Sequence, residues 1–197
     1  MNFKPLVLAL VSATALSACM GTMSTRADTA AASANAMPAN PMVGGAAMYA
    51  SRDIIDNAVN SADHTTLVAA VKAAGLVDTL KGTGPFTVFA PTNAAFDLLP
   101  AGTVDTLLMP ANKSMLTSVL TYHVVPGRLT AADLAARARA GNGRAKLTTV
   151  AGGSLWVSGS GNNWTVTDAK GGTANITIAN VMQRNGVIHV IDKVLMP

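Results

Sequence analysis

The sequence predicts one α+β domain whose sheet is built largely from its C-terminal half. Three observations lead to this class. Apolar residues recur at helical spacing through the first half of residues 51–197. In the second half, short apolar or alternating runs lie between Gly and Asn turns. The segment 51–197 also has the size of one ordinary domain, so we expect one hydrophobic core.

The first 18 residues have the pattern of a signal peptide. Lys4 supplies a positive charge, and residues 6–16 are apolar apart from one serine and one threonine. A helix needs roughly 20 apolar residues to cross a bilayer. This shorter run therefore predicts an export signal rather than a permanent span.

The residue after this signal, Cys19, is the expected site of lipidation. The sequence Leu-Ser-Ala-Cys that ends at Cys19 resembles the bacterial lipobox, in which the thiol accepts a diacylglyceryl group before cleavage. An ordinary secretory signal with an incidental cysteine is the alternative. Acylation would anchor the protein stably to a membrane. Met20 stands where, by analogy with enteric bacteria, an Asp would favour the inner membrane, so we expect the outer membrane of a bacterial envelope, on its periplasmic or surface face.

The next segment predicts a tether. From residue 21 to about residue 48 the chain consists of small and polar residues, Met and Pro, with two charges and no sustained apolar period. We therefore expect residues 19–50 to form the lipidated cysteine and a flexible tether, and residues 51–197 to form the domain.

Helices in the first half of the domain are predicted by apolar periodicity and by capping residues. Asp63 or Thr65 can cap a helix that ends at Gly75, and Thr92 can cap the helix that follows a first strand. In chain order, helices are expected over residues 52–61, 65–74, 93–99, 104–109, 113–120 and 130–140.

The strands are predicted by β-rich runs between turn residues. Val88, Val124, Ile188 and Val190 lie in runs that are apolar on both faces, which is typical of central strands. In chain order, strands are expected over residues 86–90, 147–150, 154–158, 164–168, 174–179 and 187–194.

Composition and motifs exclude several function classes. The net charge is only +4 and 12% of residues are charged, which does not favour nucleic-acid binding. The single cysteine rules out an internal disulfide, and the 3 histidines are far apart with no metal-binding spacing. No nucleophile or phosphate-loop motif occurs. We therefore expect no catalytic residues, no metal and no cofactor.

Three segments, residues 86–96, 122–127 and 185–197, resemble the signatures of the fasciclin (FAS1) family in the family's order. They are Phe-Thr-Val-Phe-Ala-Pro-Thr-Asn-Ala-Ala-Phe, Tyr-His-Val-Val-Pro-Gly and Asn-Gly-Val-Ile-His-Val-Ile-Asp-Lys-Val-Leu-Met-Pro. The resemblance implies a β-sandwich-like sheet with helices packed on it. It also implies roles in adhesion and in contact with extracellular matrix.

Tyr122 and His123 are the contact residues that the resemblance implies, because the family's Tyr-His motif is implicated in adhesion in some members. The alternative is that both side chains satisfy buried backbone groups. The position of His189 inside an apolar strand indicates the same structural role more strongly.

Trp156 is a second candidate contact, found from the alternation of its strand. Leu155 and Val157 share one face, so Trp156 lies with two serines on the other, and exposed Trp is often a binding hot spot that also stacks on sugars. Packing along its own hairpin is the alternative. Trp164 shares its face with Val166 and is expected to be buried.

The segment 128–146 is the most basic part of the chain. It has one acidic residue, and its cations could contact anionic lipid or polysaccharide. A solvated helix face followed by a polar loop is the alternative. The cations are Arg128, Arg137, Arg139, Arg144 and Lys146.

The leading functional hypothesis is an anchored, non-catalytic adhesion module that binds a matrix protein or polysaccharide. A structural envelope protein is the first alternative. A glycan hydrolase that uses paired Asp residues is the second, although nothing brings two of the Asp residues together in the sequence. The sequence predicts no oligomeric state.

Overall fold

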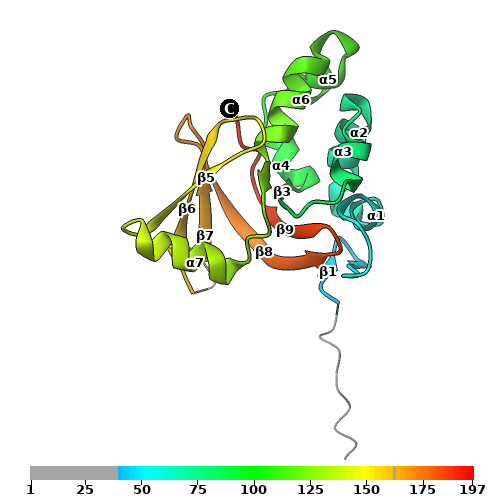
Figure 1. Cartoon of the computed structure of the whole chain (residues 1–197). Coiled ribbons are helices and arrows are strands. Elements are labelled where there is room, and N and C mark those ends of the chain that lie inside the picture. The colour runs from blue at the N-terminus through cyan, green and yellow to red at the C-terminus, as the bar shows by residue number, and fades with distance from the viewer. Residues whose placement is uncertain (1–39, 162) are drawn as a thin grey trace, which may run out of the picture. The chain divides into compact units, whose positions relative to one another are not determined.

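The computed structural model describes residues 40–161 and 163–197 (Figure 1). The expected signal peptide, Cys19 and most of the expected tether lie outside these residues. Within the described ranges, no helix is both long enough and apolar enough to cross a membrane.

One seven-stranded sheet organises the domain, in the spatial order β4-β3-β9-β8-β7-β6-β5. Its strands are β3 (Phe86–Pro91), β4 (Val124–Pro126), β5 (Arg144–Thr148), β6 (Ser154–Ser160), β7 (Asn163–Thr167), β8 (Thr173–Gln183) and β9 (Gly186–Ile191). All neighbouring strands are antiparallel except β3 and β9, which are parallel although they are far apart in the chain.

The sheet curls until its two end strands approach each other. Just beyond β5, the backbone N–H of Val150 donates a hydrogen bond of 2.8 Å to the carbonyl of Val124 in β4. The sheet is therefore nearly closed into a barrel. Val124, expected in a central strand, lies instead in the strand at one end of the sheet order.

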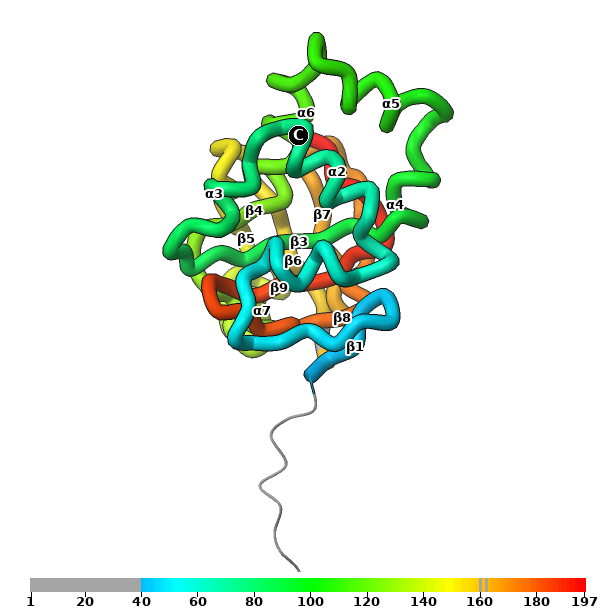
Figure 2. Tube along the Cα trace, turned by 90° about the vertical axis from the view of Figure 1, so that its right-hand side faces the viewer, coloured from blue at the N-terminus to red at the C-terminus, as the bar shows by residue number. Residues whose placement is uncertain are grey.

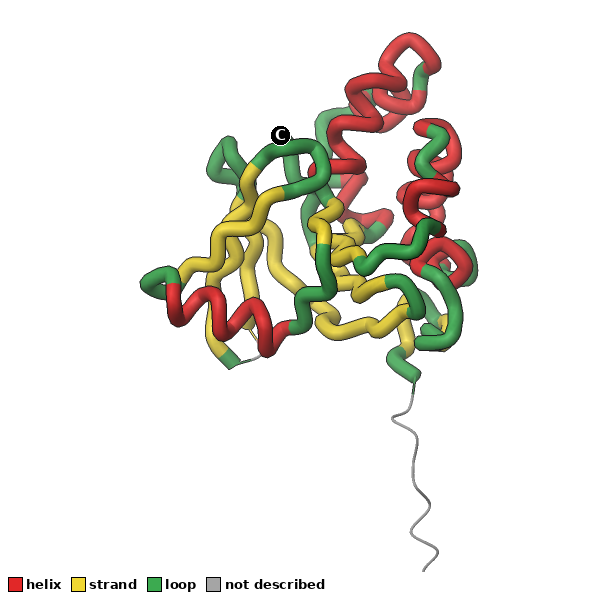
Figure 3. The backbone as a smooth tube through the Cα atoms, viewed as in Figure 1, coloured by secondary structure: helices red, strands yellow, loops and turns green. Residues whose placement is uncertain are grey.

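The helices other than α7 gather on one side of the sheet (Figure 3). Seen from that side, the cyan segment that carries α1 crosses in front of β9, and α2 and α3 lie above it in the view (Figure 2). By contrast, α7 lies apart from the other helices and packs on β5 and β6. The helices are α1 (Ile54–Ala58), α2 (Thr65–Ala74), α3 (Val77–Lys81), α4 (Asn93–Asp97), α5 (Thr103–Leu108), α6 (Lys113–Tyr122) and α7 (Ala131–Ala140), with 3₁₀ turns at Ala62–His64 and Pro110–Asn112.

The interior consists of two apolar clusters, where we expected one. The first lies between the helical layer and the strands β3, β9 and β8, and contains Val88 and Ile188. The second fills the inside of the curled sheet beneath α7, and contains Phe89 and Leu155. Because successive side chains of a strand point to opposite faces, Val88 and Phe89 enter different clusters. The α+β class with helices packed on a sheet is confirmed.

The domain begins earlier than expected. A two-stranded hairpin of β1 (Met42–Val43) and β2 (Ala46–Ala47) lies in the stretch that we interpreted as tether. Val43 and Met48 are buried in the first cluster. A low-complexity composition therefore concealed two core residues, and the boundary expected at residue 51 moves toward the N-terminus.

Local capping follows the sequence closely in two places. The Thr92 hydroxyl accepts the backbone N–H of Ala95 at the start of α4, and Gly75 ends α2 with a left-handed φ of 73°. The helix expected over residues 52–61 is shorter, because α1 ends at Ala58. The helix α3 was not expected at all.

Candidate functional site

The two residues of the Tyr-His motif lie at the end of α6 and point into the domain. Tyr122 is 0% exposed. Its hydroxyl donates a hydrogen bond of 2.8 Å to the carbonyl of Ser154 and accepts one of 2.9 Å from the N–H of Ala169. Burial raises the pKa of this phenol. Tyr122 thus joins the helical layer to β6 and to the turn before β8.

His123 is buried as well and is bonded on both sides of its ring. Nδ1 lies 2.8 Å from the carbonyl of Val119, and Nε2 lies 3.0 Å from the backbone nitrogen of Leu195. Because Val119 offers only an acceptor and Leu195 only a donor, the neutral ring with its proton on Nδ1 satisfies both. Burial lowers the pKa of His123 to about 4, so the ring is neutral near pH 7.

The contacts of Tyr122 and His123 match the alternative in which both side chains satisfy buried backbone groups. All polar atoms of both side chains are used inside the domain, where they hold backbone groups that would otherwise be unsatisfied. His189 behaves alike, since its Nε2 lies 2.8 Å from the carbonyl of Leu129 and its ring stacks on Phe89. A partner could reach none of these side chains without opening the domain.

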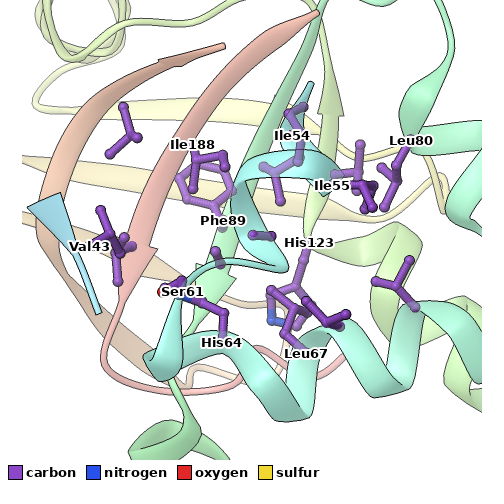
Figure 4. A pocket seen from close by; sticks show the side chains of 18 of the residues that line it. Val43, Ile54, Ile55, Ser61, His64, Leu67, Leu80, Phe89, His123 and Ile188 are labelled. Carbon is purple, nitrogen blue, oxygen red and sulfur yellow. Dashed lines mark hydrogen bonds between the residues drawn. The ribbon is translucent and has the colours of Figure 1, made fainter. Parts of the chain in front are cut away.

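An apolar cavity of about 40 Å³ lies between the helical layer and the sheet (Figure 4). Ser61 and His64 are polar residues at its wall, with the serine hydroxyl 2.9 Å from His64 Nδ1. Nε2 of His64 is buried and has no hydrogen-bond partner among the described residues. Burial lowers the pKa of His64, and the nearby Ala90 carbonyl, which favours the protonated ring, offsets this effect only in part.

This cavity is too small for an organic ligand. Its volume is about 40 Å³, whereas a cavity that admits benzene is roughly 150 Å³. Within the part of the chain that the structure describes, no three His, Cys, Asp or Glu side chains come together as a metal site would require. The cavity is therefore a packing defect beside a buried serine and histidine pair.

The alternation expected around Trp156 is confirmed. Leu155 and Val157 are fully buried, whereas Trp156 is half-buried on the opposite face of β6. Trp164 is 5% exposed, as expected, and its indole N–H donates to the carbonyl of Gly161. Of the two tryptophans, Trp156 is thus the one that solvent reaches.

Trp156 lines a shallow surface hollow with part of the basic segment. We call this surface the basic hollow, and its lining residues are Arg137, Ala140, Gly141, Arg144, Lys146 and Trp156. Lys146 lies directly opposite Trp156 in the antiparallel pair of β5 and β6. Side chains of such cross-strand partners are in contact distance, so the lysine lies beside the indole.

A tight turn brings the two arginines of the hollow together. The helix α7 carries Arg137 in its last turn, and the chain returns to Arg144 at the start of β5. The N–H of Arg144 donates to the carbonyl of Gly141, and a Cβ at Gly141 would overlap the Arg144 carbonyl oxygen. The turn therefore requires glycine at this position.

The other two cations of the basic segment lie elsewhere. Arg128 donates from its guanidinium to the carbonyls of Gln183 and Arg184, next to the turn between β8 and β9. Arg139 is exposed on α7 and does not line the hollow. The structure thus divides the expected patch, and three of its five cations gather around Trp156.

The Asp residues of the described chain act largely in caps, turns and ion pairs. Asp168 is buried and accepts hydrogen bonds from three backbone N–H groups. Asp53 pairs with Arg184, and Asp56 with Lys81. The Asp133 carboxylate turns back to Thr130 in a capping box. These positions do not form the paired carboxylates that glycoside hydrolysis requires.

The link between Lys146 and Trp156 was missed at the sequence level. We expected the strand to begin at residue 147, so Arg144, Ala145 and Lys146 were left outside it. Their alternation is the signal that was available, since Ala145 and Leu147 are buried while Arg144 and Lys146 are exposed.

Comparison with known proteins places these features in a family. A family model described as the fasciclin domain matches residues 62–197. Protein sll1483 of a Synechocystis strain is 45% identical over 158 residues, which is 79% of each chain. Cell surface glycolipoprotein MPB83 of Mycobacterium bovis is 39% identical over 122 residues, which is 62% of this chain and 48% of that one.

A solved structure shows the same fold. The FAS1 domain pair of the insect cell adhesion molecule fasciclin I matches 74% of this chain and 51% of that chain, with a TM-score of 0.66 and 21% sequence identity. At this identity the match speaks for the arrangement of helices and strands alone.

Proposed function

The chain belongs to the fasciclin domain family, and we propose that it is a non-catalytic adhesion module held at a bacterial cell envelope. It binds cell-surface or matrix components without forming covalent bonds. A surface location is supported by the mycobacterial relative, which is described as a cell surface glycolipoprotein. The insect protein with the same fold is described as a cell adhesion molecule.

One observation carries the non-catalytic part of the proposal. All 3 histidines of the chain are buried within the domain, and burial lowers the pKa of each. His123 and His189 are also bonded to backbone carbonyls. The side chains that most often act as general bases are therefore out of reach of a substrate. The exposed groups at the basic hollow suit binding instead.

A binding experiment tests the adhesion role. Beads coated with the purified full-length chain are offered extracellular matrix proteins, envelope polysaccharide and whole bacterial cells, with albumin-coated beads as the control. Retention of at least one of these materials above the control is expected. Failure to retain any of the three would contradict the proposal.

Anchoring through Cys19 is the second part of the proposal. It is supported by the apolar leader and by the lipobox-like sequence before the only cysteine of the chain. Cells that express the full chain or its Cys19→Ala variant are labelled with radioactive palmitate. We expect label and membrane association in the wild type alone. Equal labelling of the two proteins would refute lipidation without affecting the adhesion role.

A further inference from the structure

The basic hollow combines an accessible indole with three cations. Trp156 comes from β6, Arg144 and Lys146 from β5, and Arg137 from the last turn of α7. Segments that are separate in the chain thus converge on one shallow depression beside the end strand of the sheet. This convergence is a property of the fold and could not be seen in the basic segment alone.

Among the described residues, the cations of the hollow form no salt bridge with an acidic side chain, although Asp133 lies close enough to Arg137 for their charges to interact. Within residues 40–161 and 163–197, the ion pairs are those of Lys81 with Asp56 and of Arg184 with Asp53. Asp133, the nearest acidic residue in sequence to Arg137, directs its carboxylate to the hydroxyl and N–H of Thr130. The hollow therefore presents positive charge to an external anion.

The indole adds a second kind of contact. Its half-buried position on β6 restricts the ring, so less side-chain entropy is lost when a ligand covers it than for a fully exposed side chain. Sugar rings have an apolar face of C–H groups that stacks on an aromatic ring, while their substituents remain in the plane. A guanidinium beside the stack can bind a carboxylate through two parallel hydrogen bonds.

We infer that the basic hollow binds an acidic polysaccharide. One uronate ring stacks on Trp156, and the carboxylates of this ring and of neighbouring rings are held by Arg137, Arg144 and Lys146. This inference rests on the proposed adhesion role and names the class of ligand. A hollow, even a shallow one, favours a polymer segment over a flat bilayer surface, and an indole that lines it together with cations favours a sugar acid over a simple anion.

The test uses the full-length chain with sodium polygalacturonate, and with neutral dextran as the uncharged polymer. We expect binding to polygalacturonate alone, weakened as salt rises from about 50 to about 500 mM because exposed charges are screened. The chain has two tryptophans, and Trp164 is buried. Polygalacturonate should therefore change the fluorescence of the wild type, and this change should be absent in Trp156→Phe.

Matched variants separate the hollow from general charge. Arg137→Ala and Arg144→Ala should each weaken binding about tenfold, the loss expected for a hydrogen-bonded ion contact. Arg139→Ala removes the same charge from the same helix but outside the hollow, and should weaken binding less than about twofold. Equal losses at Arg137 and Arg139 would overturn the inference, because they would indicate attraction to net charge alone.

The remaining outcomes distinguish the inference from the adhesion role. Binding to phosphatidylglycerol vesicles but not to polygalacturonate would identify the hollow as a membrane contact and overturn the inference. Retention of cells or matrix proteins without binding to polygalacturonate would overturn the inference and leave the adhesion role standing. Thermal unfolding of each variant checks that a loss of binding does not come from a loss of folding.

Discussion

The imidazole Nε2 of His123 accepts a hydrogen bond from the backbone N–H of Leu195, with 3.0 Å between the two nitrogens. The bond ties the end of α6 to the segment after β9, 72 residues further along the chain. A proton on Nε2 would remove the acceptor and place a charge inside the domain. The bond therefore depends on a neutral ring.

The domain should lose stability as the pH falls below about 6.5. Burial lowers the pKa of His123 to about 4 from its ordinary value of 6.5, and it also lowers the pKa values of His64 and His189. Below about pH 6.5 the unfolded chain binds protons that the folded domain does not, so the free energy of unfolding decreases as the pH decreases. His123 alone contributes about 3 kcal/mol to the free energy of unfolding. This contribution is fully present above pH 6.5 and is lost by about pH 4.

Urea unfolding between about pH 7.5 and pH 4.5 measures this dependence. The His123→Gln variant should be less stable near neutral pH, because its amide cannot reproduce both bonds, and it should show a weaker dependence on pH. A pH dependence as steep as that of the wild type would show that His123 is not a major source of the effect.

Loss of the Tyr122 hydroxyl should destabilise the domain by about 1–3 kcal/mol, because the Ser154 carbonyl and the Ala169 N–H would lose their partner. Thermal and urea unfolding of Tyr122→Phe test this. Tyr49→Phe is the matched control, since Tyr49 is 42% exposed and its contact with Arg52 is made by the ring. Similar stability of the two variants would contradict the structural role of Tyr122.

Substitution of Gly141 should damage both the fold and the basic hollow. A methyl group there would overlap the Arg144 carbonyl oxygen, so Gly141→Ala forces the turn apart and should cost about 1–3 kcal/mol. Gly143→Asn is the control for a turn substitution without overlap, because Gly143 has open space around it. Its φ of 87° strains any side chain, although Asn less than most, so a smaller loss than at Gly141 is expected. An unchanged unfolding midpoint for Gly141→Ala would refute the close approach at this turn.

Ser61 and His64 should behave as a coupled pair. Either Ser61→Ala or His64→Leu leaves one buried polar atom without its partner, whereas the double variant removes both. We expect the loss of stability in the double variant to be smaller than the sum of the two single losses by about 0.5–3 kcal/mol. A double-mutant cycle from urea unfolding measures this coupling, and additive effects would show that the bond contributes little.

Most of the secondary structure was predicted from local sequence patterns. Thr92 caps its helix because a hydroxyl satisfies a free N–H wherever that helix packs, and Gly75 ends α2 because it tolerates a positive φ. The alternation of Leu155, Trp156 and Val157 likewise predicted which side chains are buried. Each of these inferences needs information from a few adjacent residues only.

The tertiary partners could not be obtained in this way. Tyr122 reaches Ser154 and Ala169 through the closure of the sheet, and nothing near residue 122 in the sequence encodes that distance. The pairing of Lys146 with Trp156 depends on the register of β5 and β6, and the loop between these strands is longer than predicted because β5 ends at Thr148 rather than at residue 150. For the same reason the basic hollow became visible only in three dimensions.

The parallel pairing of β3 with β9 has a consequence for how the chain reaches its folded state. Val88 pairs with Ile188, so the inner strand β3 lacks one neighbour until a segment about 100 residues further along the chain is available. Contacts between such distant residues also slow folding, because a long loop must close first. A chain that cannot complete its core early stays unfolded longer, and this delay suits the passage through a translocation channel that the proposed export and anchoring require.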